Sequence, residues 1–109
     1  MNGDFREKVL RIVKCIPPGK VTTYGLIARA AGNESAARMV GWILNSMKFN
    51  PGIPAHRVVN RNGMLTGKWH FETPDMMASL LISEGVPVKN DRIDNFKSYL
   101  WIPELNHCE

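Results

Sequence analysis

The chain has 109 residues, of which 44% are hydrophobic, and this length and composition predict one globular domain spanning residues 1–109. No apolar run approaches the roughly 20 residues that cross a bilayer, and the N-terminus lacks the basic and apolar segments of a signal peptide. Two cysteines are too few for a disulfide scaffold. We therefore expect a soluble cytoplasmic protein with no membrane partner, and nothing in the sequence suggests an oligomer.

The net charge of +4 conceals an asymmetry along the chain. Residues 1–70 carry eleven Lys or Arg against three acids, whereas residues 71–109 carry three against seven. A basic N-terminal part and a pI near 9.3 are typical of a protein that binds a polyanion. Charge alone leaves nucleic-acid binding and an ordinary solvated basic surface equally open.

The first predicted helix begins near Asp4, which can cap it, and Glu7 completes a capping box. Pro17-Pro18-Gly19 ends it. Apolar residues at helical spacing give it one buried face: Phe5, Val9, Ile12, Val13 and Ile16.

Two further helices predict a helix-turn-helix. A short helix follows Thr22-Thr23, which can serve as its N-cap, and Gly32-Asn33 breaks it. Ser35 then caps a third helix from Ala36 to about Met47, which has an apolar stripe. This third helix would be the recognition helix of the motif.

After the third helix, residues 49–54 are too rich in proline and glycine to continue a helix. Val58-Val59 and Met64-Leu65 flank Asn62-Gly63, a strong hairpin signal. A small hairpin after a helix-turn-helix predicts a winged helix, so the expected fold is mainly α with a small β-hairpin.

The C-terminal part predicts a fourth helix and a folded tail. Thr73-Pro74-Asp75 opens the helix with Thr as its cap and Pro at its first position, and Gly85 ends it. The tail is expected to hold a short extended piece and a turn of helix around Asp94 to Tyr99.

Four segments, in this order and spacing, resemble the DNA-binding domain of the O6-alkylguanine-DNA alkyltransferase family. They lie within about residues 17 to 85, most of the chain. By this resemblance Tyr24 is the tyrosine that turns the target nucleotide out of the duplex; read in isolation, it would more simply be a core or surface tyrosine. The segments are Pro18–Ala28, Gly32–Gly41, Pro54–Val59 and Asn60–His70.

The same resemblance implies the residues that hold the DNA. Arg38 matches the arginine that the family inserts through the minor groove into the gap left by the flipped base. Ala37 and Gly41 are small where the helix approaches DNA, and Asn33 and Arg61 lie where the family contacts phosphates. In isolation, Arg38 would be an ordinary exposed helix arginine.

The most specific segment lacks the residue that performs the family's chemistry. The family carries Pro-Cys-His-Arg-Val, and its cysteine accepts the alkyl group; here Ala55 stands in that place. A methyl side chain cannot act as a nucleophile. His56 and Glu84 match the family's histidine and glutamate relay, which without a nucleophile we expect to shape the pocket rather than to catalyse.

The resemblance also implies a pocket for the damaged base. Trp69 replaces the family's pocket tyrosine and, opposite the small Ala55, would leave a roomier apolar space; it can equally be part of the core. The histidines and cysteines show no ligand spacing, so no metal or cofactor is expected. The expected lining is Tyr24, Pro54, Ala55, His56, Val58 and Trp69.

The whole pattern resembles the alkyltransferase-like proteins of this family. That resemblance implies binding of O6-alkylguanine in duplex DNA by base flipping, without alkyl transfer, and marking of the lesion for nucleotide excision repair proteins. Two alternatives remain. One is an active alkyltransferase that uses Cys15 or Cys108, or a Cys→Ala variant of such an enzyme; the other is a winged-helix regulator that reads base edges in the major groove.

Overall fold

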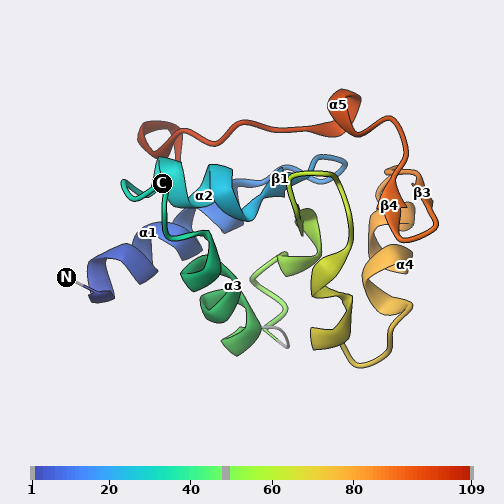
Figure 1. The fold of residues 1–109 in the computed structure, drawn as a ribbon, viewed down its shortest axis with the longest axis horizontal. Coiled ribbons are helices and arrows are strands. Elements are labelled where there is room, and N and C mark those ends of the chain that lie inside the picture. The colour runs from blue at the N-terminus through green and yellow to red at the C-terminus, as the bar shows by residue number, and fades with distance from the viewer. Residues whose placement is uncertain (1, 48–49, 109) are drawn as a thin grey trace.

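The computed structural model describes residues 2–47 and 50–108. Helices α1, α2 and α3 lie together, α4 and the β3–β4 pair lie at the other end, and the C-terminal segment crosses back from α5 toward α1 (Figure 1). In chain order the elements are α1 (Asn2–Cys15), β1 (Thr22–Thr23), α2 (Tyr24–Ala30), α3 (Ala37–Ser46), the 3-10 helix η1 (Ala55–Arg57), β2 (Val58–Val59), the 3-10 helix η2 (Thr66–His70), α4 (Met76–Ser83), β3 (Val88–Lys89), β4 (Arg92–Ile93), α5 (Phe96–Tyr99) and the 3-10 helix η3 (Leu105–His107).

Helix α1 packs its predicted apolar face into the core, but its start differs from the prediction. The helix runs from Asn2, so Asp4 lies within its first turn and the expected capping box is wrong. Asp4 instead forms an ion pair with Lys8, with 3.1 Å between Asp4 Oδ2 and Lys8 Nζ. The negative charge of Asp4 still interacts favourably with the positive N-terminal end of the helix.

The helix-turn-helix is formed by α2 and α3, which pack against each other. Thr23 caps α2 as predicted, because its Oγ1 accepts a hydrogen bond from the Leu26 amide at 3.1 Å. The predicted cap at Ser35 is wrong: α3 begins at Ala37, and the Ser35 amide and hydroxyl both donate to Asn33 Oδ1. Asn33 therefore closes the turn that precedes α3.

The hairpin lies elsewhere than the sequence predicted. Val58-Val59 pairs in parallel with Thr22-Thr23, and Met64 forms a bridge with Arg92, so the expected ladder between 58–59 and 64–65 is wrong. Asn60 Oδ1 accepts hydrogen bonds from the amides of residues 62 and 64, which closes a local turn instead.

The antiparallel hairpin is β3–β4, in which Lys89 pairs with Arg92. Its two-residue loop, Asn90-Asp91, has positive φ at both positions (54° and 60°). Two such residues are what a type I′ turn requires, and Asn and Asp adopt this conformation more readily than most residues. The fold is thus mainly helical with small β elements, as predicted, although its hairpin belongs to the tail.

Helix α4 begins later than predicted, at Met76, after a turn in which the Met76 amide donates to the Thr73 carbonyl. Neither Thr73 nor Pro74 is part of its first turn, and Asp75 takes the cap position without a side-chain hydrogen bond. Gly85, with φ of +88°, ends the helix as predicted.

The core consists of two clusters of buried apolar residues. One lies among α1, α2 and α3, and the other lies among β1, β2, α4 and β4. The C-terminal segment joins them, because Val21 exchanges backbone hydrogen bonds with Tyr99 and Trp101. Within residues 2–47 and 50–108, no helix is long and apolar enough to cross a membrane.

Candidate nucleic-acid interface

A cavity of about 600 Å³ opens between α2, α3 and η2. It brings together four residues that the sequence predicted for DNA binding: Tyr24, Ala37, Arg38 and Gly41. The sequence reasoning missed the remaining lining residues, which are Trp42, Asn45, Thr66, Gly67 and His70.

Tyr24 is the first residue of α2, and the Thr23 cap fixes the backbone that carries it. Its ring lies beside Gly41, where an added Cβ would stand 3.9 Å from the ring, and its hydroxyl lies against Gly67. Burial raises the pKa of the Tyr24 phenol, and a side-chain hydrogen bond with Thr66 offsets part of that rise. The phenol is therefore neutral near pH 7 and keeps its hydrogen-bond donor.

Helix α3 presents a row of side chains to this cavity. Arg38 is exposed in its first turn, and Trp42 and Asn45 follow at helical spacing on the same face. The Trp42 side chain is 66% exposed, which is unusual for so large an apolar group. The i, i+4, i+7 spacing from Arg38 was the sequence signal that could have identified both.

A narrower pocket of about 20 Å³ adjoins the cavity and reaches Ala55. It shares Tyr24, Gly41, Asn45, Gly67 and His70 with the larger cavity, so Ala55 lines a pocket that Tyr24 also borders. Phe71 and Leu44 supply apolar walls. The predicted juxtaposition of Tyr24 and Ala55 is therefore present.

Three predicted pocket residues do not line this space. Pro54 and His56 line a separate cavity of about 830 Å³ that Ala55 also borders, and Val58 is fully buried in β2 as part of the core. The parallel pairing of Val58 with Thr22 directs this residue into the core rather than toward the pocket.

Trp69 also lies outside the pocket, contrary to the prediction. Its side chain is 69% exposed, and Lys68 Nζ lies 4.8 Å from the centre of its ring. Three other residues of η2 line the cavity instead: Thr66, Gly67 and His70.

His56 and Glu84 form the predicted pair, and a third residue joins them. His56 Nε2 lies 2.9 Å from Glu84 Oε2, and Arg57 donates to both Glu84 oxygens, at 2.9 and 2.6 Å. Arg57 also donates to the carbonyl of Ile16 at 2.8 Å, which ties the loop to the end of α1. The bidentate Arg57–Glu84 contact is one that sequence reasoning missed.

The charges of this cluster follow from burial and hydrogen bonding. Burial alone would raise the pKa of Glu84, but hydrogen bonds from Arg57 and His56 outweigh it and bring the pKa to about 2. Burial lowers the pKa of His56, and its contact with Glu84 opposes that shift. Glu84 is therefore ionised and His56 neutral at pH 7, an arrangement that suits a structural ion pair.

Asn33 and Arg61 lie outside the cavity. Asn33 is exposed in the turn before α3, with its side-chain oxygen used by Ser35, and Arg61 is exposed in the loop between β2 and η2. Both remain predictions as phosphate contacts.

A helix-turn-helix whose second helix carries an exposed arginine beside an open cavity is typical of a DNA-binding domain. The chain belongs to the 6-O-methylguanine DNA methyltransferase DNA-binding domain family, whose model matches residues 4–86.

Two named relatives are similar to this protein over most of its chain. A DNA base-flipping protein of Escherichia coli is 41% identical over 99 residues, which are 89% of this chain and 74% of that protein. Alkyltransferase-like protein 1 of Schizosaccharomyces pombe is 34% identical over 104 residues, 92% of this chain and 96% of that one. The crystal structure of the latter with damaged DNA containing O6-carboxymethylguanine superposes with a TM-score of 0.80 over 93% of this chain and 96% of that chain, at 34% identity.

Proposed function

We propose that this protein binds O6-alkylguanine in duplex DNA by turning the damaged base into the cavity between α2, α3 and η2, and that it releases the base unchanged. The observation that carries the proposal is that Ala55 and Tyr24 line the same small pocket beside the cavity. Where an alkyl acceptor would have to stand, the chain offers a methyl group.

In this proposal α3 docks in the minor groove. Arg38 enters the gap left by the flipped nucleotide, and its planar guanidinium can both pair with the orphaned base and stack on its neighbours. Ala37 and Gly41 let the helix backbone come close to the DNA, and Asn33 and Arg61 bind phosphates on either side. Tyr24 holds the turned nucleotide out of the stack.

Selectivity in this proposal has two sources. Flipping costs a few kcal/mol of unstacking and unpairing, and this cost is least for a base whose pairing is already damaged. Alkylation at O6 removes the N1 proton of guanine and weakens its pairing with cytosine. Leu44 and Phe71 then offer apolar surface to the alkyl group.

The two cysteines are poor candidates for a substitute acceptor. Cys108 is buried in the core cluster of α1, α2 and α3, and Cys15 packs against that cluster. Burial and a hydrogen bond with Cys15 raise the pKa of the Cys108 thiol to about 12, so it holds almost no thiolate at pH 7. We therefore expect the protein to transfer no alkyl group. We also expect it to bind DNA without a metal or cofactor.

Because the bound lesion is not repaired, the complex persists and can mark the lesion for nucleotide excision repair proteins. In this proposal the protein acts in the cytoplasm. We infer that one copy of the chain, acting as a single domain, suffices for recognition. A pull-down from alkylated cells that recovers excision-repair proteins only with intact Arg38 would support the marking role. Recovery that is the same for Arg38→Ala would count against it.

The primary test compares two duplexes that differ only in one O6-methylguanine, with the protein's mass measured afterwards. Tighter binding to the lesion with unchanged mass is expected. A mass gain of one methyl group would make the protein an alkyltransferase, and equal affinity for the two duplexes would favour a general winged-helix DNA binder. Arg38→Ala should abolish the preference for the lesion rather than weaken both affinities equally.

A further inference from the structure

A second hollow, of about 710 Å³, lies between the loop of residues 60–64, the β3–β4 hairpin and the start of α5. The function proposed above uses only Arg61 from its lining. The hollow shares no residue with the Tyr24 cavity, and most of its lining, residues 89–97, lies beyond residue 86, where the match to the family model ends.

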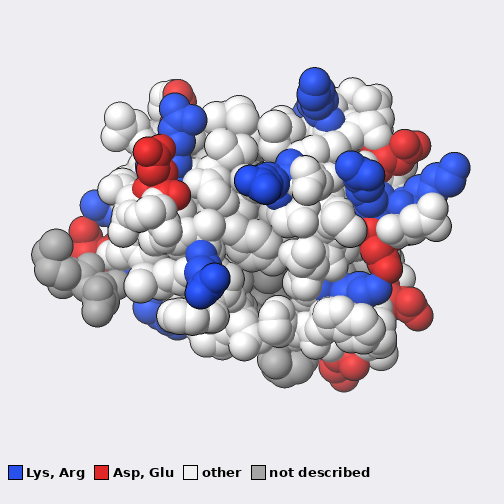
Figure 2. Space-filling model, in the orientation of Figure 1, with Lys and Arg blue, Asp and Glu red and all other residues white. Residues whose placement is uncertain are grey.

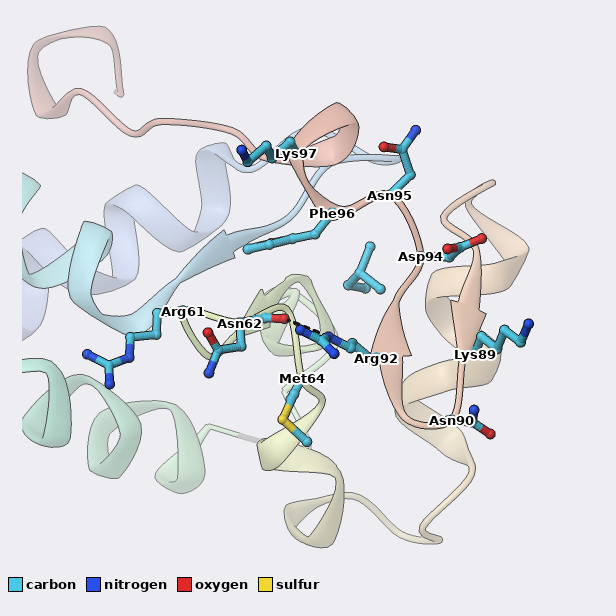
Figure 3. Close-up of a pocket in the computed structure, with 11 residues that line it drawn as sticks. Arg61, Asn62, Met64, Lys89, Asn90, Arg92, Asp94, Asn95, Phe96 and Lys97 are labelled. Atoms are coloured by element: carbon cyan, nitrogen blue, oxygen red, sulfur yellow. Dashed lines mark hydrogen bonds between the residues drawn. The ribbon is translucent and has the colours of Figure 1, made fainter.

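Basic groups dominate the lining of this hollow. Four of its residues are cationic, Arg61, Lys89, Arg92 and Lys97, against a single acid, Asp94. Arg92 points into the hollow from β4 and Lys97 lies at its rim, whereas Lys89 and Asp94 both point outward (Figure 3). The nearby carboxylate of Asp91 is paired with Lys68. The lining therefore has a net positive charge, which favours an anionic ligand.

The lining also contains apolar surface that backbone contacts hold in place. The Phe96 ring lies over Gly63, where an added Cβ would stand 2.9 Å from the ring, and the Met64 side chain is 41% exposed. The Ile93 amide donates to the Gly63 carbonyl at 2.8 Å, and Arg92 Nε donates to the Asn62 carbonyl at 3.2 Å. These bonds fix the hairpin against the loop before any ligand arrives.

We propose that this hollow binds the sugar-phosphate backbone of the same DNA duplex, away from the flipped nucleotide, as a second contact. The proposal rests on the proposed function for the identity of the duplex. A nucleic-acid backbone presents phosphates to Arg92 and Lys97 and apolar sugar faces to Phe96, which is the combination that the lining offers.

Continuity with the first interface supports this choice of ligand. Arg61 belongs to the wall of the hollow, yet its side chain extends toward the side of α2 and α3 (Figure 3). Several Lys and Arg side chains lie along this face and over the β3, β4 and α5 side, with acids between some of them (Figure 2). The longest axis of the protein, 38 Å, matches about 11 base pairs at 3.4 Å each. A duplex of about this length that lies along this axis is therefore long enough to extend over both sites.

The test uses salt dependence, because each phosphate contact contributes a slope of about 0.9 in log K against log salt. Lys97→Gln removes one cation at the rim, and Arg92→Gln/Lys97→Gln removes two. Lys8→Gln/Arg11→Gln on α1 is the matched control, because it removes the same charge from residues that line neither site. Binding is measured by fluorescence anisotropy on duplexes of about 20 base pairs, with and without O6-methylguanine, from 50 to 200 mM salt.

We expect the slope to fall by about one for the single variant and by about two for the double variant. Affinity should fall by the same factor for modified and unmodified DNA, so the lesion preference stays constant. A slope equal to that of the wild type, or an equal loss in the α1 control, would overturn the proposal. If the wild type shows no lesion preference, the proposed function fails, whereas the slopes still decide whether the hollow binds backbone. Circular dichroism of each variant confirms that the hairpin substitutions leave the fold intact.

Discussion

The hydroxyl of Tyr24 lies so close to Gly67 that a Cβ built at residue 67 would stand 2.9 Å from the phenol oxygen. Real Cβ atoms do not approach an oxygen so closely, so any side chain here would displace the tyrosine. Gly67 therefore sets the position of the ring that we assign to base turning, although it carries no functional group itself.

Replacing Gly67 with Ala should reduce lesion preference by moving Tyr24. We expect a roughly tenfold loss of affinity for O6-methylguanine DNA, because displacing a positioned group by a fraction of an ångström has an effect of this size. The affinity for unmodified DNA should change much less. Gly25→Ala is the control, because a Cβ at residue 25 meets nothing within 4 Å. Equal behaviour of the two variants in a binding titration would show that Tyr24 placement does not control recognition.

Ala55→Cys should convert lesion binding into slow methyl acceptance. The thiolate sulfur would form a bond to the methyl carbon, and the O6–carbon bond would break to leave guanine, which then takes up a proton. Mass spectrometry in a Cys15→Ser/Cys108→Ser background should show one added methyl group, because residue 55 lines the pocket that Tyr24 borders. Ala55→Ser is the control, since a serine hydroxyl is a much weaker nucleophile than a thiolate. No mass gain would mean that the base does not reach residue 55.

The sequence predicted correctly those features of the fold that depend only on residues adjacent along the chain. Thr23 caps α2 and Gly85 ends α4 because both requirements are local: a side-chain oxygen for free amides, and a residue that accepts positive φ. The motif around Ala55 identified the family because its residues are adjacent along the chain.

Long-range competition explains what sequence reasoning missed. Asn62-Gly63 forms a turn, but its flanking residues pair with β1 and with Arg92, which no local pattern reveals. The family resemblance alone places Trp69 in the pocket, whereas in the structure η2 contributes Thr66, Gly67 and His70 to the cavity and leaves Trp69 exposed. The resemblance pairs Glu84 with His56, and no local pattern in the sequence indicates that Arg57 also bonds to this carboxylate.

Trp42 should report DNA binding through its fluorescence. Its side chain is 66% exposed on the face of α3 that carries Arg38, so a docked duplex would cover it and quench its emission. Trp42→Phe should lose most of the quenching on titration with DNA. Trp69→Phe, at an equally exposed site outside the cavity, should retain it. If quenching follows Trp69 instead, the duplex lies over η2 rather than α3.

The ion pair around Glu84 predicts how stability depends on pH. Its pKa falls from 4.5 in the unfolded chain to about 2 in the folded protein, so its contribution is complete above pH 4.5 and is lost as the pH falls toward 2. That contribution is at most about 3 kcal/mol at neutral pH, at 1.36 kcal/mol per pKa unit.

Glu84→Gln should therefore destabilise the protein by roughly 3 kcal/mol at pH 7, because it leaves the guanidinium of Arg57, only 14% exposed, without its carboxylate. The destabilisation should shrink toward pH 2, where the wild type loses the same charge. Urea unfolding between pH 7 and pH 2 measures this difference, with the exposed Glu7→Gln as the control. A difference between wild type and Glu84→Gln that stays constant over this range would mean that the carboxylate charge does not stabilise the fold.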